Sequence, residues 1–455
     1  MYKVICSAIV LCLVLQTHTT LPPCSGLLRY SEKAMEHIFQ AQIFQLQDSL
    51  SNIAVTDVLP SATLDIKEIN IQTADILQIS TQLIPSFGVH VSVNADLNLT
   101  AKVVDEVVDM RVLAEIISKV QILQDFSGNP KLSIKSCNAQ IKELQVTPET
   151  TRLEALKTQI AIILNQKLCL ISSDVLLGLN VHLGEFNGFV NMGALIQIKY
   201  FLSSSPTVTS HQIEFGFNVD FYLLGKPLDI SARRKCVPLP TLTSTGISEY
   251  SLLLPEDLFN AMFSAMEWAG AFNLDISGHQ GEGTNKLTTG TLRSVNPEIP
   301  EIYPENLPII LKVGMNRTPR VTLHKDMFML YLQPSVELMV MMPQDKPYES
   351  LLVVSMDAQM KISVKIKESK LATEYVLLNR EVKLSLETSA FGSINLEELE
   401  KIIVPLLKDA LAFHYKNALG VGWTMPNLFS LKILNPFLSI NEGYAVVSGN
   451  LLIPV

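Results

Sequence analysis

Residues 159–184 read QIAIILNQKLCLISSDVLLGLNVHLG, a stretch with very few charges and many leucines, isoleucines and valines. Just upstream, Thr147-Pro148-Glu149 has the features of a helix start: a threonine cap, a proline in the first turn and an acid near the positive end of the helix dipole. The apolar residues that follow share the helical period and form one broad stripe: Leu153, Leu156, Ile160, Ile163, Leu164 and Leu168. The pattern predicts a helix whose apolar face must be covered, and we hypothesise that it lines a container for an apolar ligand. His182, near the end of the stretch, falls in a strand-like run.

The composition limits the kind of protein. At 455 residues the chain is too long for one compact core and should divide into about two or three domains. Apolar residues make up 48% of the chain and charged residues only 17%, which is below the usual share of charge. This balance indicates either a membrane protein or a soluble protein with a large interior apolar surface. No segment after the N-terminus has about 18 uninterrupted apolar residues, so we expect no transmembrane segment and favour the second class.

The N-terminus has the pattern of a signal peptide. Lys3 precedes an apolar run at residues 4–15 that is short for a membrane span, so residues 1–20 are expected to be removed on export. The protein is then secreted, and its cysteines are disulfide candidates in an oxidising compartment. Six cysteines are present, of which Cys6 and Cys12 leave with the signal. Four remain, Cys24, Cys137, Cys169 and Cys236, and Cys24 and Cys236 could pair, stay free or join another chain.

The charge excludes one class of partner. The formal net charge is −9 at pH 7, and it is spread evenly along the chain. Neither half carries the excess of basic residues that electrostatic binding of a polyanion would require. We therefore expect no nucleic-acid partner.

The first half combines helix and strand patterns. Apolar residues at every second position in residues 89–101 indicate a strand with one buried and one solvated face. A helix is expected before it, at residues 26–50. The other elements predicted for this half are strands at 112–123, 131–135 and 213–221, and an extended proline-containing connector at 226–245.

The second half repeats this order of elements. A helix is expected at residues 255–270, followed by a loop rich in glycine and threonine at 277–291 and a proline-dense segment at 297–308. Asn395, with Glu398 three residues later, is a capping-box signature and predicts a second helix. Strands are expected at 309–313, 327–332, 336–341, 351–356, 361–367, 431–440 and 444–452.

The repeated order indicates a tandem duplication in which each half is a sheet with two helices, an α+β arrangement. The predicted division is a signal peptide at 1–20, an N-terminal domain at 21–225, a connector or central sheet at 226–248 and a C-terminal domain at 249–455.

Several short segments resemble a known family. They are LNQKLCLISSDV at 164–175, GLNVHLG at 178–184, SPTVTS at 205–210, LLGKPL at 223–228, AGAFNLDISG at 269–278, PEIPEIYPENLPIILKV at 297–313, MPNLFSLKI at 425–433 and EGYAVVSG at 442–449. These segments span nearly all of the mature chain. On them the chain is identified as a member of the family of bactericidal/permeability-increasing protein, lipopolysaccharide-binding protein and PLUNC proteins.

The resemblance implies a boomerang of two pseudo-symmetric barrels, each a twisted antiparallel sheet wrapped on long helices, joined by a central sheet. It implies one apolar pocket per barrel that holds phospholipid acyl chains, and a disulfide between Cys137 and Cys169. Family members that bind lipopolysaccharide carry basic residues at the N-terminal tip. Here the expected tip segments, residues 42–52 and 90–100, contain no lysine or arginine, which argues against lipopolysaccharide as a partner.

Apolar side chains on the predicted helices are the candidates for lipid contact, because a lipid tail gains free energy simply from leaving water. The same stripes would also serve as ordinary core, and the resemblance is what favours a pocket. The candidates are Ile160, Ile163, Leu164, Met262, Met266, Ile403 and Leu406.

The sequence has no HExxH, GxSxG or CxxC motif, so we expect neither an enzyme nor a metal or cofactor site. Asn98 and Asn316 each begin an Asn-X-Thr acceptor for a glycan. The expected function is a secreted lipid-binding protein that sequesters phospholipid or a similar lipid, and the family resemblance implies a role in innate defence at mucosal surfaces. The alternative is a secreted interaction or surface-active protein whose barrels are filled by side chains.

Overall fold

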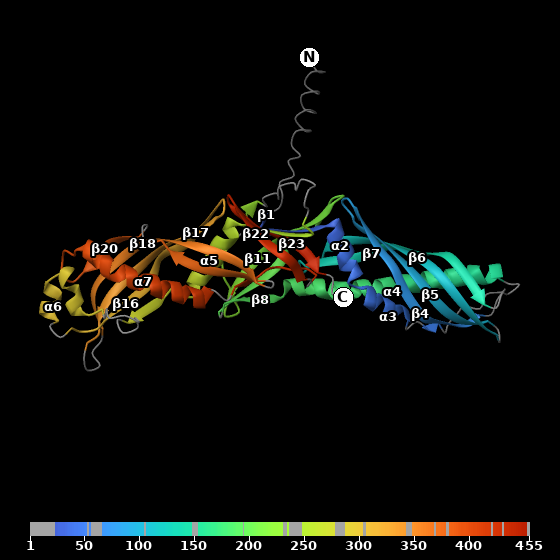
Figure 1. Ribbon diagram of the computed structural model, residues 1–455, viewed down its shortest axis with the longest axis horizontal. Coiled ribbons are helices and arrows are strands. Elements are labelled where there is room, and N and C mark those ends of the chain that lie inside the picture. The colour runs from blue at the N-terminus through green and yellow to red at the C-terminus, as the bar shows by residue number, and fades with distance from the viewer. Residues whose placement is uncertain are drawn as a thin grey trace, which may run out of the picture.

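The computed structural model describes residues 23–51, 54–55, 66–103, 106–147, 153–193, 195–230, 234–235, 248–277, 287–303, 306–342, 348–367, 370–378, 382–419, 422–429 and 432–452. They form an elongated, bowed molecule with one half of the chain in each arm and a shared sheet in the middle (Figure 1). The predicted signal peptide and Cys236 lie outside the described residues. The α+β class and the two-armed shape expected from the sequence are confirmed.

The N-terminal arm is built on a sheet of consecutive antiparallel strands. Its order is β3 (Ala54–Val55), β4 (Ile66–Ile84), β5 (Gly88–Val103), β6 (Glu106–Gln124) and β7 (Pro130–Thr147). The strand predicted at 89–101 is β5, and its odd-numbered apolar residues from Val89 to Ala101 are all buried. The strand predicted at 131–135 is the beginning of the longer β7.

Helix α4 (Leu153–Gly184) runs along this arm and packs against β7 (Figure 1). The helix predicted from the apolar stripe is confirmed, but its predicted cap is wrong, because Thr147 is the last residue of β7 and α4 begins at Leu153. The strand-like interpretation of His182 is also wrong, because the helix continues through it. Residues Gly178–Gly184 form the last two turns of α4, and the buried Leu179 and Leu183 are four residues apart, as expected for one face of a helix. The disulfide between Cys137 and Cys169 is present and joins β7 to α4, with the two Cα atoms 5.7 Å apart.

The helix predicted over residues 26–50 is wrong in its first part. Residues Gly26–Ser31 form strand β2, and only then do α2 (Glu32–Gln40) and α3 (Ile43–Ser51) follow. Leu27 and Leu28 lie in this strand because β11 (Gln212–Leu223) and β14 (Tyr250–Pro255) pair with it on either side. Ser31 then caps α2, and its Oγ accepts a hydrogen bond from the Ala34 amide at 3.1 Å.

The central sheet draws strands from both halves of the chain. Its order is β22-β23-β14-β2-β11-β9-β8, with β10 and β12 beside β11. The members not yet given are β8 (Phe189–Met192), β9 (Ile196–Leu202), β10 (Thr207–Val208), β12 (Lys226–Pro227), β22 (Lys432–Asn441) and β23 (Tyr444–Leu452). From the predicted connector, Lys226–Pro227 joins this sheet, and β13 (Arg234–Lys235) pairs with β1 (Pro23–Cys24).

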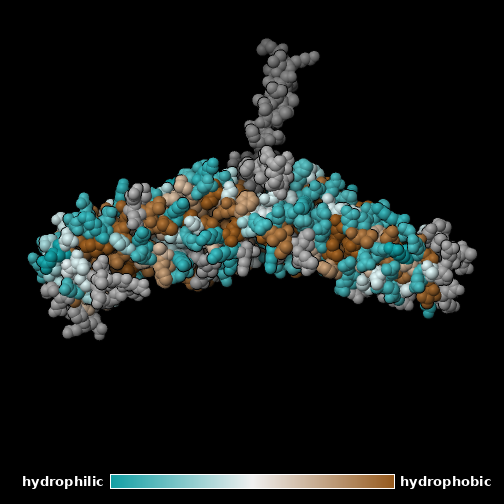
Figure 2. Space-filling model, in the orientation of Figure 1, coloured by the Kyte–Doolittle hydropathy of each residue, from teal (hydrophilic) through white to brown (hydrophobic). Residues whose placement is uncertain are grey.

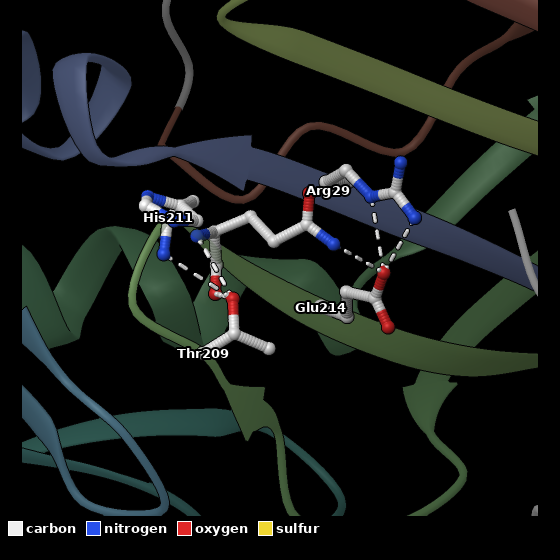
Figure 3. A network of polar contacts seen from close by, with 5 residues as sticks. Arg29, Thr209, His211 and Glu214 are labelled. Carbon is white, nitrogen blue, oxygen red and sulfur yellow. Dashed lines mark hydrogen bonds and ion pairs between the residues drawn. The ribbon is translucent and has the colours of Figure 1, made fainter. Parts of the chain in front are cut away.

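A buried ion pair lies within the central sheet. Arg29 of β2 and Glu214 of β11 are directly opposite each other, and Arg29 Nη2 is 2.6 Å from Glu214 Oε1 (Figure 3). Gln212 donates a further hydrogen bond to the same oxygen at 3.0 Å. This carboxylate therefore compensates for burying the arginine, whose side chain is only 6% exposed.

The C-terminal arm repeats the plan with a seven-stranded antiparallel sheet of order β15-β16-β17-β18-β19-β21, in which β20 also pairs with β18. Helix α5 packs against β16 of this sheet, and helix α7 packs against β19 (Figure 1). The bounds are β15 (Leu274–Ser277), β16 (Ile309–His324), β17 (Met327–Val340), β18 (Glu349–Lys367), β19 (Lys370–Leu377), β20 (Lys383–Ser389), β21 (Trp423–Thr424), α5 (Glu256–Trp268), α6 (Glu298–Ile302) and α7 (Leu396–Leu419).

Several details of this arm differ from the sequence-based expectation. The strands predicted at 351–356 and 361–367 are parts of one strand, β18. The strands predicted at 327–332 and 336–341 form one strand, β17, which continues through Pro334 at a place where its partner β16 bulges. The capping box at α7 is only half formed. Asn395 Oδ1 accepts from the Glu398 amide at 3.2 Å, whereas the Asn395 amide donates to the carbonyl oxygen of Val295 at 3.0 Å.

Candidate functional site: two unequal apolar cavities

A cavity of about 240 Å³ lies where α5 meets the central sheet and β19. We call it the C-terminal cavity. Its walls come from both halves of the chain, because strands β8 and β9 and the residues between them contribute one side. Its lining residues are Met192, Gly193, Leu195, Ile196, Phe259, Met262, Phe263, Met266, Ala269, Gly270, Ala271, Phe328, Val364, Leu371, Thr373, Tyr375, Gly422 and Trp423.

Helix α5 supplies the largest share of this wall. Phe259, Met262, Phe263 and Met266 follow the i, i+3, i+4, i+7 spacing that places residues on one side of a helix. The ring of Phe259 meets that of Phe328 edge to face, with centroids 4.9 Å apart. Methionine side chains are flexible and polarisable, so this face can adapt to an irregular apolar guest.

The polar groups of the C-terminal cavity are few and uncharged. No charged residue lines it within the described part of the chain. The hydroxyl of Thr373 donates to that of Tyr375 at 2.9 Å. Burial raises the pKa of Tyr375, so this hydroxyl stays neutral at physiological pH. The cavity is therefore suited to hydrocarbon and has no paired acid and base for catalysis.

The corresponding cavity of the N-terminal arm is much smaller, about 50 Å³. It lies between α2, α3, α4 and the sheet, and is lined by Phe39, Gln42, Leu46, Ile79, Val91, Val93, Ser118, Val120, Ile134, Ser172, Val175 and Leu176. This volume is about that of one or two water molecules, which is too small for a lipid tail.

The structure separates the predicted lipid contacts into two groups. Met262 and Met266 both line the C-terminal cavity. The other candidates line neither cavity: Ile160, Leu164 and Ile403 are buried in the core, while Ile163 and Leu406 are half-buried against it. Sequence reasoning missed Phe259, Phe263 and Trp423. The two phenylalanines repeat at the same helical spacing as the methionines and could have been included.

Helix α4 also carries apolar side chains on its outer face. Ile162, Leu170, Leu177 and Val181 are 58%, 58%, 63% and 62% exposed. Figure 2 shows apolar residues gathering along both arms on the face in view. By length and composition alone, residues 160–187 could cross a membrane, although in this fold the helix packs on β7 and α3. We call these four residues the α4 outer stripe.

The two glycan acceptors are accessible. Asn98 and Asn316 both lie exposed on strands, β5 and β16. Asn98 Nδ2 donates to Thr73 Oγ1 at 2.8 Å, and Asn316 Nδ2 donates to Glu387 Oε1 at 2.7 Å. Among the residues that the structure describes, no group of three or more His, Cys, Asp and Glu side chains is arranged to hold a metal ion.

Two curled antiparallel sheets, each backed by helices, flank a shared central sheet, and an uncharged cavity lies where α5 meets that sheet and β19. These features define a two-armed α+β protein with an apolar cavity. The chain belongs to the LBP / BPI / CETP family: the model of the N-terminal domain matches residues 28–179, and that of the C-terminal domain matches residues 191–452. Membership of this family implies lipid binding, and neither model describes a catalytic domain.

Individual relatives agree with this assignment. The chain is 28% identical to mouse BPI fold-containing family B member 2 over 439 residues, which cover 93% of each chain. It is 28% identical to the human protein of the same name over 388 residues, or 84% of each chain. A crystal structure of lipopolysaccharide-binding protein superposes with a TM-score of 0.57 at 16% identity, covering 94% of this chain and 99% of the other. That likeness shows the shared fold.

Proposed function

We propose that the protein is a secreted, non-catalytic lipid-binding protein that holds an acyl chain of a phospholipid or similar lipid in the C-terminal cavity. The observation that carries the proposal is the uncharged wall of that cavity, built from the phenylalanines and methionines of α5. Its mechanism is sequestration: the acyl chain of the lipid enters the cavity, the head group stays at the mouth, and no covalent bond changes.

The size of the cavity supports one guest chain. Pockets that enclose drug-sized ligands span about 300–1,000 Å³, so a cavity of about 240 Å³ fits a single tail rather than a whole phospholipid. Each methylene removed from water contributes about 0.8 kcal/mol, so roughly ten methylenes contribute about 8 kcal/mol before the costs of ordering. Before those costs are subtracted, this free energy corresponds to a dissociation constant of about micromolar order, so the measured binding should be weaker than that.

The lipid class follows from charge as well as from shape. A lipopolysaccharide-binding protein shares the fold. In this chain, however, residues 42–52 and 90–100 of the N-terminal arm contain no lysine or arginine. We therefore propose a lipid recognised by its tail, and not lipopolysaccharide.

Native mass spectrometry of the secreted protein tests this function. The expected result is a population whose mass exceeds that of the polypeptide and its glycans by one lipid, and this lipid should be recovered by extraction with organic solvent. Protein that carries no lipid, and that takes up none from phospholipid vesicles, would count against the proposal.

A second candidate function is surface activity, and the α4 outer stripe is the observation that favours it. Its four exposed aliphatic residues span about 28 Å of helix, and the cavity described between this helix and the sheet measures only about 50 Å³. A variant with Ile162, Leu170, Leu177 and Val181 all changed to serine should then lose surface-pressure activity at an air–water interface. If this variant spreads as well as the wild type, surface activity through the stripe is excluded.

The biological setting that we propose is innate defence at mucosal surfaces, with glycans on Asn98 and Asn316. The setting rests on the resemblance to the family that includes bactericidal/permeability-increasing protein, and the exposure of both asparagines supports the glycans. Intact mass before and after glycosidase treatment, for the wild type and for Asn98→Gln and Asn316→Gln, tests the glycan assignment.

We also propose that the chain divides into an N-terminal domain at 21–225 and a C-terminal domain at 249–455.

A further inference from the structure

A second, polar hollow lies on the C-terminal sheet, on the side facing away from the core. Its volume is about 710 Å³, and strands β16, β17, β18 and β20 all contribute to it. We call it the polar hollow. Its lining residues are Arg317, Thr318, Arg320, Thr322, Tyr331, Leu332, Gln333, Asp357, Ala358, Gln359 and Lys383.

Irregular strand pairing produces this hollow. The register of β16 against β17 shifts twice, between Met315 and Arg317 and again between Arg317 and Arg320. Each shift inserts an extra residue into β16, which bends the strand and turns its side chains. Pro334 of β17 lies opposite Met315 at the first shift. The two arginines are therefore placed at the rim by a feature of the backbone.

A hydrogen bond crosses the sheet beside the hollow. Strands β16 and β20 lie on opposite sides of the β17–β18 pair. Even so, Asn316 Nδ2 of β16 donates to Glu387 Oε1 of β20 at 2.7 Å. The outward-facing residues of β17 and β18 thus form a floor, and β16 and β20 form two sides.

The hollow collects positive charge in a chain whose net charge is −9. Arg317, Arg320 and Lys383 are exposed, and none of the three forms an ion pair within the described residues. The single carboxylate, Asp357, accepts a hydrogen bond from Gln333 Nε2 at 2.7 Å. Three cations against one carboxylate leave a local positive excess.

One polar atom of the lining has no partner. The hydroxyl oxygen of Thr322 is shielded from solvent and forms no hydrogen bond to any described residue. A buried hydroxyl without a partner is costly, and a ligand or an ordered water in the hollow would supply one.

We propose that the polar hollow binds a sugar or polyol bearing phosphate or sulfate groups. Guanidinium groups bind phosphate and sulfate oxygens through paired N–H donors, and two arginines at one rim suit a ligand with more than one such oxygen. The volume of about 710 Å³ exceeds what a bare inorganic anion fills, so the hydroxyl and amide groups of the floor face the polyol part. This site is separate from the C-terminal cavity, and its occupation does not depend on lipid binding there.

Asn316, a proposed glycan acceptor, directly precedes Arg317 of the lining, so the site is tested by calorimetric titration of the full-length protein with inositol trisphosphate before and after glycosidase treatment. We expect saturable binding that weakens as salt is added, with no binding of uncharged myo-inositol and weaker binding of inorganic phosphate. Arg317→Gln and Arg320→Gln should each weaken binding about tenfold, while Arg317→Lys should retain part of it. Phosphatidylcholine vesicles with and without phosphatidylinositol bisphosphate show whether the same group is also bound as a lipid head group.

The matched control is Lys312→Gln, which removes an exposed cation from the same strand outside the hollow. This variant should bind inositol trisphosphate as the wild type does. Equal binding of myo-inositol and inositol trisphosphate, or equal losses in Lys312→Gln and the arginine variants, would overturn the proposal. Unchanged circular dichroism spectra of the variants establish that any loss is not unfolding.

Discussion

The hydroxyl of Tyr200 donates a hydrogen bond to the carbonyl oxygen of Thr424 at 3.0 Å, across 224 positions of sequence. Tyr200 belongs to β9 in the central sheet, and its ring lies 6.4 Å from that of Trp423, which lines the C-terminal cavity. Two more buried tyrosines hold the same segment. Tyr250 donates to the Pro426 carbonyl at 3.1 Å, and Tyr30 accepts from the Leu428 amide at 3.3 Å. The central sheet therefore fixes one wall of the cavity.

Replacing Tyr200 with phenylalanine should destabilise the protein by about 1–3 kcal/mol. The change leaves the packing in place but removes the hydrogen bond that the buried Tyr200 hydroxyl donates to the half-buried Thr424 carbonyl. Urea unfolding followed by tryptophan fluorescence measures the effect. Tyr222→Phe is the control, because Tyr222 is half-buried and its ring packs on Phe189, and it should change stability by less than about 0.5 kcal/mol. Equal losses in the two variants would contradict the role given to the Tyr200 hydroxyl.

Removing the disulfide should cost about 3–4 kcal/mol. The bond joins residues 32 positions apart, and closing a loop of that length restricts the unfolded chain by about this amount. The double variant Cys137→Ser/Cys169→Ser should therefore unfold at a lower guanidinium concentration than the oxidised wild type. Wild type kept reduced throughout should match the double variant, and a match to the oxidised wild type instead would exclude the effect.

Asn180 should stabilise the attachment of α4 to the sheet. Its side chain imitates a strand partner for Leu132 on the edge strand β7: Oδ1 accepts from the Leu132 amide at 2.7 Å, and Nδ2 donates to the Leu132 carbonyl at 2.8 Å. Asn180→Ala loses both bonds and should cost about 2 kcal/mol in chemical denaturation. Asn191→Ala, which removes only an exposed side-chain contact to Gln197, should be nearly neutral. Amide exchange at Leu132 should rise only in the first variant.

Glu249 should make stability depend on pH in the acidic range. Its carboxylate is almost fully buried, which by itself raises its pKa. Hydrogen bonds from the Leu451 amide at 2.8 Å and from Lys33 at 3.0 Å outweigh burial, and the pKa is lowered from its ordinary value of 4.5. A group with a lowered folded-state pKa contributes stability that is present above the ordinary value and is lost as pH falls through the lower one.

Melting temperatures measured from about pH 7 to about pH 3 test this prediction. Glu249→Gln should be less stable than the wild type at neutral pH, and the difference should shrink as the solution is acidified below about pH 4.5. The control is Glu374→Gln, since Glu374 pairs with Lys365 in full exposure and should matter little. A difference that grows on acidification would reverse the sign of our argument.

Regular local patterns predicted the strands and helices well. Strand β5 was predictable because one face is buried and the other solvated, so its apolar residues alternate from Val89 to Ala101. Strand β2 was not, because all six of its residues are buried, so its two faces do not alternate in polarity. It pairs with β11 and β14 along its two edges. Its identity as a strand depends on partners far away in the sequence.

The cavity was predictable only in part. The stripes of α4, α5 and α7 give the same signal in sequence. Of the seven candidates, however, Met262 and Met266 line the C-terminal cavity, whereas Ile160 and Ile403 are buried in the core and line neither of the two described cavities. Whether an apolar stripe lines a cavity or packed core depends on the size of the side chains that the opposite helices and strands place against it. Trp423 and Leu371 reach the cavity from other elements, and no local period indicates that.

The central claim is that the C-terminal cavity holds an acyl chain, and palmitate binding to a cavity-filled variant tests it most directly. Ala269 lines the cavity, so Ala269→Phe should fill it, whereas Ala390→Phe places the same ring at an exposed position outside it. Calorimetric titration should show binding to the wild type and to Ala390→Phe, and at least about tenfold weaker binding to a folded Ala269→Phe. Equal affinities in all three proteins would contradict the account.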